Sequence, residues 1–523
     1  MNIPNIKTPT YLRLALAVFT FSLISLEKHS CSAGGITVIT HGQGSDIDSW
    51  VSYMATRIDE YRFFPGSKAT FYKVSVDFTN SAFVSSWQRL GGNDPLTSDS
   101  GEIVLLFDWR NLANTSYSTM QVAPLFASTL LSPAFIPELG GHAPAELPIH
   151  TIGHSRGGSL LSEVIKLLGT NGVWVDHQTT LDGYAFQNDA MLTNTYENVL
   201  FHDNYWQDNS LSIHGFARAG AYNRRLTALQ GGYWPDYIND HSDVHLWYHG
   251  TIDWNTPAND GNASVSTVER LFWWTSAEER GTNAGFLYSL IGGGNRMNTA
   301  APVHPDSGRI VDGFNQRWDL GAGTAVNNRQ ILPSVLSSWP NVIRLNITGP
   351  LSLGQGQSTT VQFYYQWAFG ALETNATVSF YLDSDANPWN GNEAFITNTL
   401  VGTTTANQVG NRTVTLTVNL DHQPGTYRVL SKIQYGARSR YLYATERITV
   451  LGAPSPLRVA VGLEIDRRVR IDTFADVGNR IVLEASVNLF SWQPIATNVL
   501  QNSRWSVVEN PSFSRRFYRA VQR

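Results

Sequence analysis

An α/β fold with a mostly parallel sheet is the class that the sequence predicts for the N-terminal part of this 523-residue chain. Short apolar segments of strand length alternate there with segments at helical spacing, which favours a parallel sheet covered by helices on both faces. A strand, a tight turn and a helix follow one another between residues 147 and 168. After residue 340 the pattern changes to short alternating strands separated by turn residues, which is typical of a β-sandwich.

Length and local composition divide the chain into four segments. Residues 1–33 are predicted to be a signal peptide, because basic residues precede an apolar core and small residues follow up to Ala33. We expect the α/β domain over residues 34–340, a β-sandwich of immunoglobulin-like type over 341–452, and a small C-terminal β module over 457–523. The residues just before 457 are rich in Gly and Pro and have the composition of a linker.

The composition excludes some partners and favours export. A formal net charge of −5 argues against nucleic acid as the main partner. Cys31 is the one cysteine and lies in the expected signal peptide, so the mature chain would carry no disulfide. No interior apolar run is long enough to span a bilayer. We therefore expect a secreted or cell-surface protein, with a retained N-terminal anchor as the alternative.

The elements of the α/β domain are predicted from periodicity. In parallel sheets, catalytic groups gather at the carboxyl ends of the strands. The part from residue 248 to 340 is rich in Gly, Asn and Trp, and we expect a cap or surface loops there, with a helix near 268–279. The expected strands are 35–40, 69–76, 102–107, 147–152, 177–182 and 198–203, and the expected helices are 46–61, 117–131 and 159–168.

The sequence from Gly153 to Gly157 has the form G-x-S-x-G and is predicted to be a nucleophile elbow. The two glycines remove side chains that would collide where the strand reverses into the helix. Ser155 then lies at the apex with the helix N-terminus behind it, a favourable place for developing negative charge. A buried strand before the motif and an amphipathic helix after it make a nucleophilic serine the favoured interpretation over a structural turn.

A serine nucleophile needs a base to accept its proton and an acid to orient that base. We expect the acid to be Asp182, at the end of the strand that follows the elbow helix. Asp203, at the end of the next strand, is the alternative. The oxyanion hole is predicted to consist of two backbone N–H groups, from Arg156 after the nucleophile and from Gln43 in an early Gly-rich loop.

Five short motifs occur in an order that resembles the pancreatic-type lipases, a family with the α/β-hydrolase fold. The resemblance extends over about residues 35–252 and implies that fold. It departs from the family at Arg156, where an apolar residue is usual, at Gly183, where proline is usual, and in lacking the lid cysteines. The motifs are His41-Gly42-Gln43, Phe107-Asp108-Trp109-Arg110, Gly153-His154-Ser155-Arg156-Gly157, Leu181-Asp182-Gly183, and Asp240-His241 with Trp247-Tyr248 downstream.

The resemblance places the catalytic histidine at His241. His245, four residues later, would share a helical face with His241 and is the alternative base. Asp108-Trp109-Arg110 is expected to serve structure beneath the site. From about residue 458 the chain resembles a C-terminal β module common on secreted bacterial proteins, which implies export or surface presentation.

No cofactor and no metal ion are predicted at this site, because the sequence contains no H-E-x-x-H motif. A stretch with oxygen-bearing residues at alternate positions, including Asp383 and Asp385, resembles a calcium loop. It has Pro388 where an EF-hand needs Gly, and it lacks the terminal Glu. A turn rich in Asp and Asn is the favoured interpretation.

The leading functional hypothesis is a secreted serine hydrolase that cleaves carboxylic esters, with a small-molecule, lipid or polymeric ester as substrate. One alternative is a non-catalytic surface or adhesion protein. Another is a carbohydrate esterase or a peptidase, with Phe272-Trp273-Trp274 as a platform for sugars. We also expect the C-terminal β domains to contact a cell surface or carbohydrate.

Overall fold

The computed structural model describes most of the chain after residue 33. The expected signal peptide and much of the expected cap lie outside the described residues. The described residues are 34–59, 69–190, 194–207, 213–227, 229, 231–233, 240–253, 260, 263–274, 285–289, 315, 329–333, 339–367, 375–404, 409–452, 456–510 and 515–523.

An eight-stranded sheet forms the centre of the N-terminal part, with the order β3-β2-β4-β1-β5-β6-β7-β8. Its neighbouring strands are parallel except for β2 and β3, which form an antiparallel hairpin. The central strands are buried on both faces, as expected when helices cover a parallel sheet. The strands are β1 (Gly35–Thr40), β2 (Thr70–Thr79), β3 (Ala82–Gly92), β4 (Glu102–Asp108), β5 (Ile149–His154), β6 (Val175–Leu181), β7 (Val199–Trp206) and β8 (Tyr222–Arg225).

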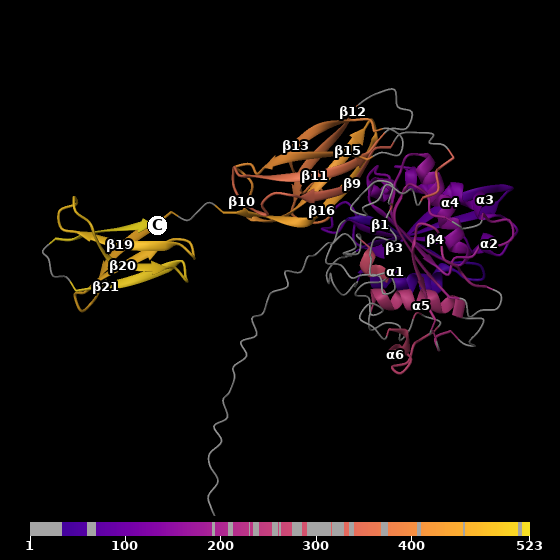
Figure 1. The fold of residues 1–523 in the computed structure, drawn as a ribbon, viewed down its shortest axis with the longest axis horizontal. Helices are drawn as coiled ribbons and strands as arrows, with labels where there is room; N and C mark the ends of the chain where they lie inside the picture. The colour runs from indigo at the N-terminus through magenta and orange to yellow at the C-terminus, as the bar shows by residue number, and fades with distance from the viewer. Residues whose placement is uncertain are drawn as a thin grey trace, which may run out of the picture.

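Helices cover the two faces of this sheet, and each face has its own apolar core (Figure 1). Val38 and Ile39 are neighbours in β1 but belong to different cores, because successive side chains of a strand point to opposite faces. One core includes α3 and α4, and the other includes α1 and α5. The helical segments are η1 (Ile47–Val51), α1 (Ser52–Asp59), α2 (Arg110–Ala113), α3 (Thr119–Leu131), η2 (Pro137–Leu139), η3 (Pro144–Glu146), α4 (Arg156–Thr170), α5 (Asp240–Ile252), α6 (Arg270–Trp273) and η6 (Gly285–Tyr288).

A β-sandwich follows, built from a five-stranded sheet, β10-β16-β15-β12-β13, and a three-stranded sheet, β14-β11-β9. Inward-facing residues of both sheets form one apolar core, which includes Phe363 and Phe380 with ring centroids 5.4 Å apart. The strands are β9 (Asn341–Ile347), β10 (Ser352–Gly354), β11 (Ser358–Gln366), β12 (Asn375–Asp383), β13 (Glu393–Gly402), β14 (Gly410–Thr417), β15 (Gly425–Tyr435) and β16 (Arg438–Leu451).

The C-terminal unit consists of two three-stranded antiparallel sheets, β17-β18-β21 and β20-β19-β22. Its core is small and is formed by Ala475, Ile481 and Leu500 with partly buried neighbours. Figure 1 shows this unit at one end of the molecule, beyond the sandwich. The strands are β17 (Arg458–Leu463), β18 (Val469–Phe474), β19 (Arg480–Ser486), β20 (Gln493–Val499), β21 (Arg504–Glu509) and β22 (Phe517–Gln522).

The α/β class and the α/β-hydrolase fold that the sequence predicts are wrong for this protein. Strands account for 46% of the structure and helices for 18%, and the strands lie in five separate sheets. Of the 22 strands in the described residues, 14 lie after residue 340, and only the eight before it belong to the helix-covered sheet. From residue 341 onward the described chain forms strands and no helix. The protein is therefore mostly β.

The sandwich packs against the edge of the large sheet where its parallel strands begin. Arg440 of β16 donates hydrogen bonds to Ala145 O, at 2.8 Å, and to Asp176 Oδ2, at 3.1 Å. Trp174, just before β6, donates from Nε1 to Gln366 Oε1 at 3.1 Å. Apolar residues of the sandwich also join the core under α3 and α4, so the two units share buried surface. These residues are Leu430, Tyr441 and Tyr443.

Replacing Arg440 with Ala should destabilise the protein by about 3–5 kcal/mol, because Asp176 would remain buried without its cationic partner. Urea unfolding measures the loss. Arg412→Ala is the control, since Arg412 is exposed on β14, and its effect should stay within about 0.5 kcal/mol. Equal effects of the two substitutions would contradict this view of the interface.

Several histidines are buried in the N-terminal part, and His249 of α5 is the simplest case. Its ring nitrogens have no hydrogen-bond partner among the described residues. Burial, and secondarily the positive charge of Arg57, lowers the pKa of His249 from 6.5 to about 3. The folded protein therefore resists protonation of this ring in a range where the unfolded chain accepts it.

Within the described residues, no helix has the length and apolar character needed to cross a bilayer.

His249 should make the folded state less stable as the pH falls. Its contribution is fully present above pH 6.5 and is lost toward pH 3, because only the unfolded chain binds the proton in that range. The expected slope is about 1.4 kcal/mol per pH unit. His249→Leu should remove this slope from the urea-unfolding free energy between about pH 6.5 and pH 5. An unchanged pH dependence in the variant would show that His249 is protonated in the folded state.

Candidate functional site

Ser155 lies at the turn between β5 and α4, in a conformation that few residues adopt. Its φ is 55° and its ψ is −129°, which costs about 1–3 kcal/mol for a residue other than glycine. The turn is compact, and its close packing leaves no room for a side chain at either glycine. A Cβ on Gly153 would lie 2.8 Å from Gly157 O, and one on Gly157 would lie 2.5 Å from His41 O. The backbone N–H of Ser155 donates to Leu181 O at 3.0 Å, which ties the turn to β6.

The loop after β1 approaches Ser155 closely. A Cβ on Gly42 would lie 2.6 Å from Ser155 Cβ and 3.0 Å from Ser155 Oγ. Gly44 N donates to Asn114 Oδ1 at 2.8 Å, which holds the loop in place. Gln43 is exposed between these glycines. Arg156 begins α4, where a backbone N–H has no acceptor within the helix. The two segments that carry the predicted oxyanion donors therefore lie on either side of Ser155.

Asp182 and His241 are joined by a hydrogen bond of 2.6 Å between Oδ2 and Nδ1. Asp182 follows β6, is fully buried, and has a φ of 45°. Its carboxylate also accepts hydrogen bonds from Gln207 N and Nε2, at 3.0 and 2.9 Å, and from Gly215 N at 2.7 Å. Because Nδ1 of His241 donates to this carboxylate, Nε2 remains available to accept a proton.

His154 brings the start of α5 next to the elbow. Its Nε2 donates to His241 O at 2.8 Å, and the two rings have centroids 4.5 Å apart. Burial, together with the neighbouring His241, lowers the pKa of His154 well below its usual value, so this ring is neutral. No hydrogen bond joins Ser155 Oγ to the His241 ring in the described part of the chain. Such contacts are often loose without substrate and tighten when it binds.

The side chain of Arg156 turns away from Ser155 and forms a buried ion pair with Asp189. Nε donates to Oδ2 at 2.7 Å and Nη2 donates to Oδ1 at 3.0 Å. Further donors of Arg156 reach Ala113 O and Tyr117 O, at 2.7 and 2.6 Å. Arg156 therefore ties the elbow to the segment between α2 and α3. Sequence reasoning missed Asp189, although a buried arginine requires a carboxylate partner.

Asp203, the alternative acid, does not contact His241. Its carboxylate accepts hydrogen bonds from His177 Nε2 at 2.8 Å, Thr179 Oγ1 at 2.6 Å and Tyr205 OH at 3.0 Å. The ring of His177 is stacked in turn on that of His150, with centroids 3.9 Å apart. Asp203 thus belongs to a separate buried network between β5, β6 and β7.

His245, the alternative base, is buried beside His154, with ring centroids 4.7 Å apart. Its ring is stacked on Trp50, with centroids 4.2 Å apart, and its Nδ1 lies 3.6 Å from Asp260 Oδ2. Burial and the neighbouring His154 and His241 lower the pKa of His245 well below its usual value. It therefore packs against Trp50 as a neutral ring.

Asp108, after β4, is a buried anion with three basic neighbours. Burial raises its pKa, but hydrogen bonds from His41, Arg110 and Lys73 outweigh burial and hold the pKa below the usual range. Arg110 and Lys73 contact its oxygens at 2.8 and 2.9 Å. The Trp109 Nε1 donates to His41 O at 3.1 Å, so this motif also supports the loop that approaches Ser155.

The loop with Asp383 and Asp385 is an anchor between units. Asp383 is buried and accepts hydrogen bonds from the Tyr443 hydroxyl and from Asp385 N. Asn387 donates from Nδ2 to Pro95 O at 2.8 Å, which fixes the loop to the N-terminal part. Over the residues that the structure describes, no group of three or more His, Cys, Asp or Glu side chains could hold a metal ion.

The aromatic segment Phe272-Trp273-Trp274 does not form a flat platform. Phe272 is exposed, but Trp273 and Trp274 are buried in the core under α5, and Trp247 Nε1 donates to Trp273 O at 3.1 Å. This placement removes the support for a sugar platform at this segment.

No protein-family model matches the chain, and no curated protein is similar to it. Solved structures resemble parts of it. The CARDB domain of the PF1109 protein from Pyrococcus furiosus, in complex with di-metal ions, is 14% identical over 22% of this chain and 90% of that chain, with a TM-score of 0.15. Bovine butyrophilin is 8% identical over 34% of this chain and 98% of its own, with a TM-score of 0.16. A chaperone–tip adhesin complex of CFA/I fimbriae is 15% identical over 34% and 94%, with a TM-score of 0.14. At TM-scores this low, the similarities indicate no activity.

Proposed function

We propose that this protein is a serine hydrolase that cleaves carboxylic esters through an acyl-enzyme. The observation that carries the proposal is the 2.6 Å hydrogen bond from His241 to the buried carboxylate of Asp182, beside a serine held in a strained turn. A carboxylate in this position fixes the tautomer of the imidazole and stabilises its protonated form. Ser155, His241 and Asp182 have the roles of nucleophile, base and acid.

In the proposed reaction, Ser155 Oγ attacks the ester carbonyl while His241 Nε2 accepts the hydroxyl proton. The N–H groups of Gln43 and Arg156 donate to the oxyanion, where α4 adds the positive end of its dipole. Collapse of the tetrahedral intermediate breaks the bond to the alcohol, which leaves with the proton from His241. Water then adds to the acyl-enzyme by the reverse sequence of proton transfers and releases the carboxylic acid.

A purely binding role explains these features less well. The turn at Ser155 stores strain, and Asp182 buries a negative charge that four hydrogen bonds must satisfy. Both arrangements lower the stability of the fold, and strained residues and buried ionisable groups are concentrated at catalytic sites. Export is a separate part of the proposal and rests on the apolar segment within residues 1–33.

Ser155→Ala should abolish hydrolysis of p-nitrophenyl esters, with kcat falling by about 10⁴-fold or more, because the turn keeps its shape and loses only the nucleophile. Esters of graded chain length report the acyl preference of the wild type. Ser162→Ala is a matched control, since Ser162 lies on α4, the helix that follows Ser155, and its hydroxyl accepts a hydrogen bond from Gln178. Its activity should remain close to the wild-type value.

A serine-reactive phosphonate should label the wild-type protein once, on the peptide that contains Ser155, and should not label Ser155→Ala. Label on another serine, or ester turnover above a few per cent in Ser155→Ala, would rule out Ser155 as the nucleophile.

Asp182→Asn should lower kcat by about 10²- to 10⁴-fold, because it keeps the shape of the side chain but removes the charge that stabilises the imidazolium. Asp203→Asn should lower kcat by less than about tenfold on the same ester, since its contacts are with His177 and Tyr205. Circular dichroism checks that both variants are folded. The reverse ranking would assign the acid to Asp203.

A further inference from the structure

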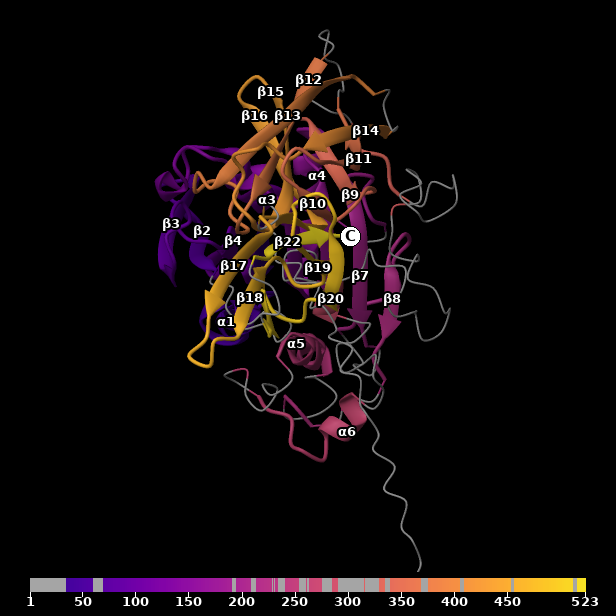
Figure 2. The same ribbon diagram turned by 90° about the vertical axis from the view of Figure 1, so that its left-hand side faces the viewer.

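Two loops lie at one end of the C-terminal unit. The register pairs Leu463 with Val469, and Val469 with Glu509, so the β17–β18 hairpin and the last residue of β21 share an end. Ser486 pairs with Phe517, which places the loop after β19 at the start of β22. Arg516, just before β22, lies 2.7 Å from Glu509, so this loop is at the same end. We call the β17–β18 hairpin and the loop after β19 the apolar tip. The C-terminus lies at the opposite end of β22 and faces the sandwich in Figure 1, and Figure 2 views the unit from its far side.

The apolar tip exposes large apolar side chains. Ile465 is 106% exposed and Leu463 is 72% exposed on the β17–β18 hairpin. Phe490 is 93% exposed and Leu489 is 53% exposed on the loop after β19. These are separate projecting side chains on neighbouring loops, which differs from the flat apolar patch of a typical protein interface.

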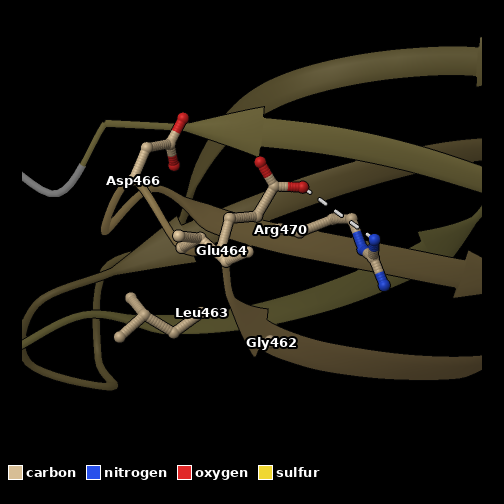
Figure 3. Close-up of a pocket in the computed structure, with 6 residues that line it drawn as sticks. Gly462, Leu463, Glu464, Asp466 and Arg470 are labelled. Carbon is tan, nitrogen blue, oxygen red and sulfur yellow. Dashed lines mark ion pairs between the residues drawn. The ribbon is translucent and has the colours of Figure 1, made fainter.

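The charge of this unit is opposite to that of the whole chain. From Pro456 to Arg523 there are ten arginines and six Asp or Glu residues, whereas the chain has a formal net charge of −5. At the apolar tip the acidic side chains are neutralised, since Arg468 contacts Asp466 and also lies 3.5 Å from Glu464. Figure 3 shows Glu464 paired also with Arg470, next to Leu463. Arg467 and Arg515, just before β22, are exposed and form no ion pair within the described chain.

We propose that the apolar tip docks this protein onto an anionic lipid surface. Leu463, Ile465 and Phe490 would insert among the acyl chains. Arg467 and Arg515, which form no ion pair in the described chain, would bind lipid phosphates. Apolar insertion together with basic charge is the combination that gives peripheral proteins stable membrane contact. A protein partner would need a continuous complementary surface, and the projecting side chains provide none. This proposal does not depend on the chemistry at Ser155.

Co-sedimentation with vesicles tests the proposal. The full chain carrying Ser155→Ala, which cannot hydrolyse lipid under the proposed mechanism, is mixed with phosphatidylcholine vesicles with and without phosphatidylglycerol. Binding should require phosphatidylglycerol and weaken as salt screens the charges. Ile465→Asp with Phe490→Asp should lower the affinity by about tenfold or more, because two apolar groups are lost from the bilayer and two negative charges are added. The N-terminal apolar segment is common to all variants, so differences between variants report the apolar tip.

The matched control is Val477→Asp with Val499→Asp. These residues are exposed at the other end of the same unit, and binding should not change beyond the small effect of charge. Arg467→Glu with Arg515→Glu keeps the apolar residues and should also weaken binding to anionic vesicles. Any one of four results would overturn the proposal. The first three are no binding of the parent protein, equal binding to neutral and anionic vesicles, and equal loss in the apolar-tip and control variants. The fourth is concentration-dependent dimers that Ile465→Asp with Phe490→Asp abolishes, without vesicle binding, which would show a second copy as the partner.

Discussion

The close approach of three backbone segments around Ser155 is the constraint on which the site depends. Strand β5 lies between β1 and β6, so the carboxyl ends of these strands are neighbours. The segments meet at Gly42 and Gly157, where glycine has no side chain to keep them apart. Since Ser155 N bonds to Leu181 O, the residue after Leu181 must also lie beside the elbow, and that residue is Asp182. The position of Asp182, the proposed acid, thus follows from the order of the strands and from the glycines that let the segments approach.

Buried charges around the elbow are satisfied in separate groups. Arg156 is neutralised by Asp189, and Asp108 is neutralised by Arg110 and Lys73, so neither contributes a free charge to the site. Asp182 differs from these aspartates because its donors are backbone and amide groups and one histidine. Its negative charge acts on the His241 ring, the group that would become cationic in the proposed acyl transfer, and also on the buried guanidinium of Arg218.

Local sequence patterns predicted the strands and helices near the site. They did not predict which residues far apart in the sequence contact each other. Alternation and glycine spacing suffice to place Ser155 between a strand and a helix. The contact of Asp182 with His241, 59 residues apart in sequence, was expected from the resemblance. The partners of Arg156 and Arg440 could not be predicted, because nothing near either residue in sequence indicates Asp189 or Asp176. The fold class was wrong because the helices of one region are outweighed by strands over the described chain, 18% against 46%.

The sandwich contacts the large sheet at the edge opposite the candidate site. Arg440 and Trp174 make their contacts before or at the start of β5 and β6, whereas Ser155 and Asp182 lie after the last residues of these strands. At about 3.3 Å per residue, the length of β6 places the two edges roughly 20 Å apart. The sandwich therefore contacts the amino edge of the sheet, opposite the carboxyl edge where Ser155 and Asp182 lie. A substitution of Arg440 or Trp174 would therefore act on the candidate site only by loosening the sheet, since both side chains lie at the opposite edge of the sheet from Ser155 and Asp182.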